Sequence, residues 1–129
     1  MKRKKIVLLT VTCSLAVFLA RAQATPTKRY DETTKTCRTL TMENDLRGYQ
    51  VFREFCKECH SRKNEQAKFL YSESKMPNAW NRVFFKKYPE CAKNGAWDQL
   101  TLEDQLKLND YLFRTGAGSY DPNNANDCG

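Results

Sequence analysis

Cys56-Lys57-Glu58-Cys59-His60 is a C-x-x-C-H run whose residue types and spacing could do chemistry together. On a helix, two thiols three positions apart point to the same side. Each thiol can form a thioether with a vinyl group of haem, and the adjacent imidazole can bind the iron as proximal ligand. The run therefore predicts one covalently attached c-type haem, with Cys56 and Cys59 as tethers and His60 as an iron ligand.

Closely spaced cysteines also occur in thioredoxin-like redox pairs, zinc sites and disulfide frameworks. A redox pair follows a strand in a βαβ setting, and the hydropathy pattern does not predict one here. A closed zinc site needs four ligands, so Cys91 or Cys128 would have to complete the set without a second C-x-x-C. All three fit less well than haem. A non-haem disulfide or zinc-binding module is kept as the second alternative.

Two amphipathic segments are predicted as the helices that position the motif. The first runs from about Glu43 to Glu58, where apolar residues recur at three- and four-residue spacing as far as the motif. The second runs from Leu102 to about Arg114, with Thr101 and Asp104 forming a capping box at its start.

The segment between these helices is predicted to hold two more helices and a loop. A helix begins at Pro77, turns Trp80, Val83, Phe84 and Tyr88 inward and is ended by Pro89. Residues 64–71 are expected to form a short helix, and residues 90–100 a loop. No stretch alternates with period two for long enough to predict a strand. The expected fold class is all-α, a small bundle of 3 to 5 helices wrapped around one covalently bound haem.

The first 24 residues have the pattern of a secretory signal peptide. Basic residues at positions 2–5 precede an apolar run over residues 6–19, and Ala22-Gln23-Ala24 is a small-x-small cleavage pattern. The run is shorter than the roughly 20 residues that a membrane-spanning helix needs. A cleaved signal is therefore favoured over an uncleaved anchor. Cys13 lacks the preceding small residues of a lipoprotein site, so lipid anchoring is not expected.

A chain of 129 residues fits one domain behind such a signal. We expect residues 1–24 to be the signal peptide, 25–42 an irregular N-terminal arm, 43–115 the haem domain and 116–129 a C-terminal tail. The mature protein is expected in the periplasm of a bacterium, without a membrane span, as a monomer or a subunit of a complex.

The net charge of +7 belongs mostly to the signal. Five basic residues and no acidic one lie there, so 17 basic residues remain against 15 acidic ones, a net charge of +2. Residues 25–93 carry +6 and residues 94–129 carry −4. The charge is therefore split between a basic portion that bears the motif and an acidic C-terminal portion. Aromatic residues do not form a stacking pattern among the lysines, so nucleic acid is not expected as a partner.

The sequence resembles the class I, mitochondrial-type c-type cytochromes. Gly48, Phe52 and the motif reproduce the family's G-x-x-x-F-x-x-x-C-x-x-C-H opening, and Leu108–Leu112 resembles the Leu-x-x-Tyr-Leu of its closing helix. The resemblance implies that Gly48 lies where the first and last helices cross, with Phe52 and Tyr111 packed at the crossing. It also implies redox partners that dock on basic residues around the haem edge, here Lys57, Arg62, Lys63, Lys75, Lys86 and Lys87.

The family's usual distal iron ligand is a methionine between the motif and the last helix. Only Met76 lies there, and Met76-Pro77 looks like the family's Met-Pro pair. His60 is the single histidine, so two histidine ligands from this chain are excluded. Met76 is thus the tentative distal ligand, and an open or differently ligated iron is the alternative.

Cys37, Cys91 and Cys128 remain, and an odd number leaves one thiol unpaired. Export favours a disulfide, and a Cys91–Cys128 bridge is mildly preferred, although pairing with Cys37 stays open.

The expected function is that of an exported monohaem c-type cytochrome that carries single electrons between a donor and an acceptor redox protein. No enzymatic turnover is expected, because the motif has no paired carboxylates or second histidine near it. The alternative is a cytochrome subunit of an exported oxidoreductase, or an open-site haem protein that binds a gas.

Overall fold

The computed structural model describes residues 25–119 and Cys128 of the chain, so the predicted signal peptide and most of the predicted tail lie outside the described residues. In chain order the elements are β1 (Lys28–Asp31), β2 (Thr36–Thr39), α1 (Met42–Val51), the π-helix η2 (Phe52–Cys56), α2 (Lys57–Cys59), the 3₁₀-helix η3 (Ser72–Ser74), α3 (Pro77–Lys86), α4 (Glu90–Lys93) and α5 (Leu102–Thr115). The described part is mostly helical, and none of its helices is long and apolar enough to cross a membrane.

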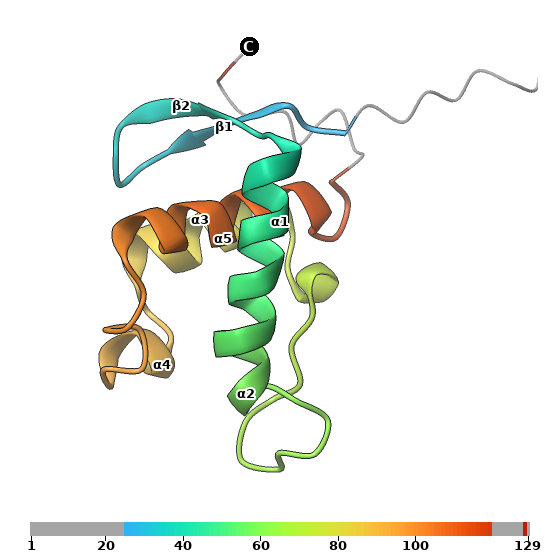
Figure 1. Ribbon diagram of the computed structural model, residues 1–129, viewed down its shortest axis with the longest axis vertical. Coiled ribbons are helices and arrows are strands. Elements are labelled where there is room, and N and C mark those ends of the chain that lie inside the picture. Colours follow the sequence, from blue (N-terminus) through green and yellow to red (C-terminus); the bar gives the residue numbers. More distant parts are fainter. Residues whose placement is uncertain (1–24, 120–127, 129) are drawn as a thin grey trace, which may run out of the picture.

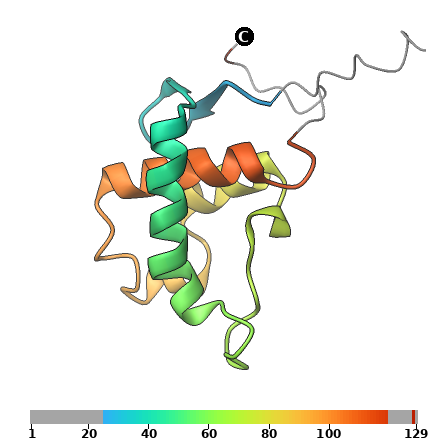
Figure 2. The same ribbon diagram turned by 45° about the vertical axis from the view of Figure 1, so that its right-hand side comes forward.

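Helices α1, η2 and α2 follow one another without a break and run away from the hairpin (Figures 1 and 2). Helix α5 crosses α1, and α3 packs on another side of α5 (Figure 2). The core lies between these three helices and contains Val51, Phe52, Trp80, Val83, Phe84, Leu100, Leu108 and Leu112. Tyr88, which the sequence predicts to face inward, is 43% exposed.

The crossing of α1 and α5 has the residues that the resemblance implies. A Cβ added to Gly48 would collide with the Lys107 carbonyl oxygen and would lie 2.6 Å from Cβ of Tyr111. The rings of Phe52 and Tyr111 are tilted with centroids 6.0 Å apart, and Tyr49 also contacts Tyr111 at 5.7 Å. Glycine is therefore required at position 48 because the two backbones approach too closely for a side chain.

The ends of the predicted helices are mostly confirmed. Thr101 caps α5 by accepting a hydrogen bond of 3.1 Å from the Asp104 backbone N–H. Pro77 is the first residue of α3, and Lys87 ends that helix in the left-handed region at φ 45°. Residues 64–71, however, are not helical, so the predicted short helix is wrong.

The expected helical fold is confirmed in part: the described chain is mostly helical, but residues 28–39, predicted as part of an irregular arm, form an antiparallel hairpin. Lys28 pairs with Thr39 and Asp31 with Thr36. The Asp31 carboxylate accepts hydrogen bonds from the backbone N–H groups of Thr33 and Thr34 at 3.0 and 2.9 Å, which shape the turn.

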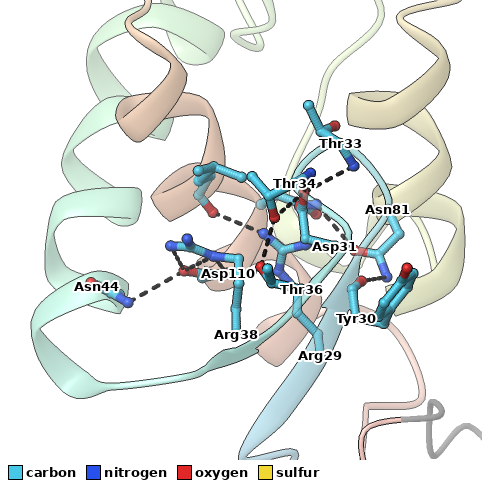
Figure 3. Close-up of polar contacts among 12 residues, drawn as sticks. Arg29, Tyr30, Asp31, Thr33, Thr34, Thr36, Arg38, Asn44, Asn81 and Asp110 are labelled. Carbon is cyan, nitrogen blue, oxygen red and sulfur yellow. Dashed lines mark hydrogen bonds and ion pairs between the residues drawn. The ribbon is translucent and has the colours of Figure 1, made fainter.

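The hairpin is joined to α5 by buried charges instead of apolar side chains (Figure 3). Arg29 is fully buried and donates from Nε to Asp110 Oδ1 at 2.6 Å and from Nη1 to Asp31 Oδ2 at 2.6 Å. Arg38 donates to Asp110 Oδ2 at 2.7 Å, and Asn44 Nδ2 donates to the same oxygen at 3.3 Å. Because the inward positions of β1 are Arg and Asp, hydropathy alternation could not reveal the strand.

Cys37 of β2 is disulfide-bonded to Cys128. The predicted disulfide is therefore confirmed, but the preferred Cys91–Cys128 pairing is wrong, and Cys91 is the thiol left over. The sequence predicts that Cys37 lies in an irregular arm. The buried salt bridges instead hold the hairpin, and with it Cys37, against α5.

Candidate functional site

A cavity of about 380 Å³ lies between the motif and the segments that follow it. Cys56, Cys59 and His60 all line it, so the fold brings the three predicted motif residues to one space. Its other walls come from α3, the segment around α4 as far as Leu100, Leu112 of α5, and the segment before α3, which contributes Lys68, Leu70 and Lys75. Apolar rings dominate these walls, namely Phe55, Trp80, Phe84 and Trp97, of which Phe84 and Trp97 stack with centroids 5.2 Å apart.

The helix that carries the motif changes its geometry just before the cavity. Over Phe52–Cys56 it is a π-helix, and the Lys57 N–H donates to the Phe52 carbonyl instead of to the residue four positions back. A π-helical turn accommodates an extra residue and changes which side the following residues face. The motif therefore does not simply continue the apolar face of α1, as the 3.6-residue pattern predicts.

His60 is held by a backbone carbonyl. Its Nδ1 lies 2.7 Å from the carbonyl oxygen of Lys68. A carbonyl oxygen only accepts hydrogen bonds, so Nδ1 carries the proton, and in the neutral ring Nε2 keeps its lone pair. Metal-binding histidines usually donate their other ring N–H in this way, which fixes both the tautomer and the ring orientation. His60 thus has the protonation pattern that iron ligation through Nε2 requires.

The motif thiols differ in exposure, since Cys56 is half-buried and Cys59 is exposed. Burial raises the pKa of Cys56 from 9.0 to about 12, with Cys91 and Cys59 adding to the rise and Lys57 opposing it. Cys56 is therefore a neutral thiol at physiological pH. The nucleophilic cysteine of a catalytic C-x-x-C has a lowered pKa instead, because the thiolate is the nucleophile, so the pKa of Cys56 is shifted in the opposite direction.

Met76 is not among the residues that line the cavity, and its side chain is 50% exposed. Its neighbour Lys75 does line the cavity, and the Lys75 Nζ lies 5.9 Å from the ring centroid of Trp80. Cys91 lines the cavity as well. The structure thus brings the tethers and His60 together but does not bring the tentative distal ligand to them.

The donors around the cavity are suited to haem because two thiols, one imidazole with a free Nε2 and several aromatic rings meet at one apolar space. Among residues 25–119 and Cys128, no group of three or more His, Cys, Asp or Glu side chains is gathered so that it could hold a metal ion, which is the arrangement that the zinc alternative needs.

Sequence reasoning missed three features of this site. The Lys68 carbonyl is a backbone group on an irregular segment, so no residue type signals it. Cys91 and Trp97 come from the loop predicted over residues 90–100, and only their residue types, a thiol and a large ring, hinted at a role. Comparison of the chain with protein-family models, curated protein sequences and solved structures finds no match.

Proposed function

We propose that this chain is an exported monohaem c-type cytochrome that passes single electrons between redox proteins. The observation that carries the proposal is the cavity shared by Cys56, Cys59 and His60, with the His60 Nδ1 proton engaged by the Lys68 carbonyl. The site thus combines a C-x-x-C-H motif, an apolar space beside it and a histidine oriented to ligate through Nε2. Haem c attachment uses all three.

Each residue has a definite part in this proposal. Cys56 and Cys59 would hold the haem through thioether bonds, and His60 would bind its iron through Nε2. Trp80, Phe84 and Trp97 would exclude water from the macrocycle, and burial of this kind tunes the reduction potential. When bound, the haem supplies reversible one-electron chemistry at iron, so the protein's own task is to hold, orient and shield it.

The helix crossing supports the class I cytochrome resemblance independently of the motif. Gly48, Phe52 and Tyr111 meet where α1 and α5 cross, as the resemblance implies. The predicted export signal and the Cys37–Cys128 disulfide are both consistent with a periplasmic protein, since disulfides persist in oxidising compartments.

Haem attachment is tested by expressing the full chain in a periplasm with c-type haem maturation and measuring covalently bound haem. We expect the unmodified protein and Cys91→Ala to carry one haem that resists extraction, and the Cys56→Ala/Cys59→Ala double variant to carry none. Cys91 is the matched control because it is a free thiol on the same cavity. A colourless unmodified protein would instead support the non-haem disulfide or zinc-binding module.

The sixth iron position decides between the carrier and the alternative function. Met76 remains the proposed distal ligand. Because its side chain is half exposed and does not line the cavity, an open-site, gas-binding haem protein or a cytochrome subunit of an oxidoreductase is the alternative function. In a methionine-ligated carrier, Met76→Ala abolishes the weak long-wavelength ferric band that marks sulfur ligation, and only the variant binds CO readily. In the open-site alternative, the unmodified ferrous protein already binds CO, and Met76→Ala changes neither spectrum.

A further inference from the structure

Residues 68–70 lie along the end of the helix that carries the motif and are attached to it at His60. The Lys68 carbonyl accepts from His60 Nδ1 at 2.7 Å, and the Leu70 N–H donates to the His60 carbonyl at 3.3 Å. These bonds join a regular element to a segment without helix or strand geometry. The segment therefore needs a further attachment if the Lys68 carbonyl is to stay in place.

Lys57, the first variable residue of the motif, provides that attachment. Its Nζ donates to the Leu70 carbonyl at 2.6 Å and lies 3.8 Å from the centroid of the Phe69 ring. A charge-assisted hydrogen bond and a close cation–π contact are both stronger than their neutral equivalents. Lys57 thus fixes the two residues directly after Lys68, the residue whose carbonyl holds His60.

We propose that Lys57 is a positioning residue for the iron ligand: it holds residues 68–70 so that the Lys68 carbonyl keeps the His60 Nδ1 proton and leaves Nε2 free toward the cavity. This inference rests on the proposed function, because Nε2 matters as the atom that would bind iron. A hydrogen bond at Nδ1 makes the imidazole a stronger electron donor and stabilises ferric iron. Lys57 would therefore tune the potential as well as the ring orientation.

The proposal gives Lys57 a different role from the docking role that the resemblance implies. Its ammonium group is half-buried and occupied by a carbonyl and a ring within the chain. Lys63 is an exposed lysine of the same region and is suited to meeting a partner. Replacing Lys57 should change the haem site, whereas replacing Lys63 should change only the salt dependence of partner encounters.

The test compares the haem-loaded unmodified protein with Lys57→Ala, Lys57→Arg and the control Lys63→Ala. We expect solvent exchange of the His60 Nδ1–H proton, followed by NMR in the ferrous state, to be roughly tenfold faster in Lys57→Ala, the effect of losing about one hydrogen bond. The reduction potential should rise in the same variant. Lys57→Arg should restore both, and Lys63→Ala should change neither. Unchanged exchange and potential in Lys57→Ala would overturn the proposal.

Two further arms keep the outcomes distinct. If Lys57→Ala does not fold, Phe69→Leu removes the ring but leaves the Leu70 carbonyl, and an intermediate increase in exchange is expected. Unchanged exchange of the His60 Nδ1–H proton in that variant contradicts the positioning role of Lys57.

If the unmodified protein carries no haem, the proposed function fails, and the positioning role of Lys57 is then tested on the haem-free protein. Nitrogen-15 shifts of His60 should show the Nδ1–H tautomer in the unmodified protein and a mixture in Lys57→Ala, and the same tautomer in both would overturn it.

Discussion

Gly48 shows how a single missing side chain determines where two helices meet. The Lys107 carbonyl and Tyr111 Cβ occupy the space that a Cβ would need, and both belong to α5. Backbone atoms inside a helix cannot move aside as the end of a flexible side chain can. The approach of α1 to α5 is thus fixed at this residue, and with it the direction in which the helix reaches the motif.

Replacing Gly48 with alanine is predicted to destabilise the protein by about 3 kcal/mol, as expected for overpacking against backbone. Helix propensity alone predicts the opposite sign, since alanine is better than glycine inside a helix by about 1 kcal/mol. Denaturant unfolding of the Gly48→Ala variant decides between the two. Gln50→Ala is the matched control, an exposed position on the same helix, and a stable Gly48→Ala variant would contradict the close crossing.

The sequence predicts single residues well where one residue type has one physical use. Gly48 at the crossing and Thr101 at the helix cap are of this kind, and the structure places both as predicted. Cys56, Cys59 and His60 line one cavity, and their role in holding a haem stays a prediction. Met76 is different, because a thioether can ligate iron or simply lie at the start of a helix. Residue type alone does not choose between these two, and in this structure the side chain is half exposed.

Among the elements, the hairpin is the one whose stability depends on charge. Arg29 and Asp110 are both fully buried, so the removal of either leaves the other without a partner in a low-dielectric interior. The sequence could not predict this element, because its buried positions are charged and its strands are only four residues long. The long helices α1, α3 and α5, by contrast, bury apolar stripes, and the sequence predicts each of them within a few residues.

The Asp110→Ala variant is predicted to lose about 3–5 kcal/mol of stability, because both Arg29 and Arg38 lose their carboxylate. Asp110→Asn should lose less, since one acceptor oxygen remains. Thermal or denaturant unfolding measures both, and Asp98→Ala, at an exposed position, is the control. A loss no larger than that of the control would mean that the buried network contributes nothing to stability.

The hairpin also gives the fold a pH dependence through Asp31. Burial works to raise the pKa of Asp31, but hydrogen bonds from Thr34 and Arg29 outweigh it, so the pKa lies below 3.8. A carboxyl whose folded-state pKa is lowered stabilises the fold above its unfolded pKa and loses that contribution as the pH falls. We therefore expect the stability gap between the unmodified protein and Asp31→Asn to be full at pH 7 and to shrink below about pH 4. A gap that is constant from pH 7 to pH 2 would contradict this assignment.

At the scale of the whole molecule, the cavity could not be predicted from the sequence, although the long helices beside it could. Helix α4, which carries Cys91 of the cavity wall, lies where the sequence predicts a loop. The cavity walls come from an irregular segment before η3, from the loop around α4 and from three helices, and irregular segments have no periodic signal. The charge split is readable from the sequence alone, and the structure adds which basic residues are free. Arg62, Lys63, Lys86 and Lys87 are exposed, although the Arg62 guanidinium lies 5.2 Å from the centroid of the Phe69 ring. Lys57 and Lys75 are half-buried, and Lys75 lines the cavity.

Electron transfer to an acidic redox protein is predicted to slow as salt is raised, because screening shortens the range over which exposed lysines attract a partner. Lys63→Gln/Lys86→Gln should lower the second-order rate constant at low salt and flatten its salt dependence. Lys28→Gln, an exposed lysine of the hairpin, is the control. Stopped-flow kinetics over a range of ionic strength measures these rate constants. If the double variant and the Lys28→Gln control have equal effects per charge removed, the partner does not dock preferentially on the face that carries Lys63 and Lys86.

The Cys37–Cys128 bond has a consequence for the timing of maturation. Cys37 precedes Cys56 and Cys59 in the chain, whereas Cys128 comes 91 residues after Cys37. In a chain exported from its N-terminus, three thiols reach an oxidising compartment before the correct partner of Cys37 does. Haem attachment in that interval would remove two of the three competing thiols, Cys56 and Cys59, and leave Cys91. Late attachment would leave Cys37 free to form a wrong bridge with the motif, so for the proposed exported haem protein we expect the yield to depend on which reaction comes first.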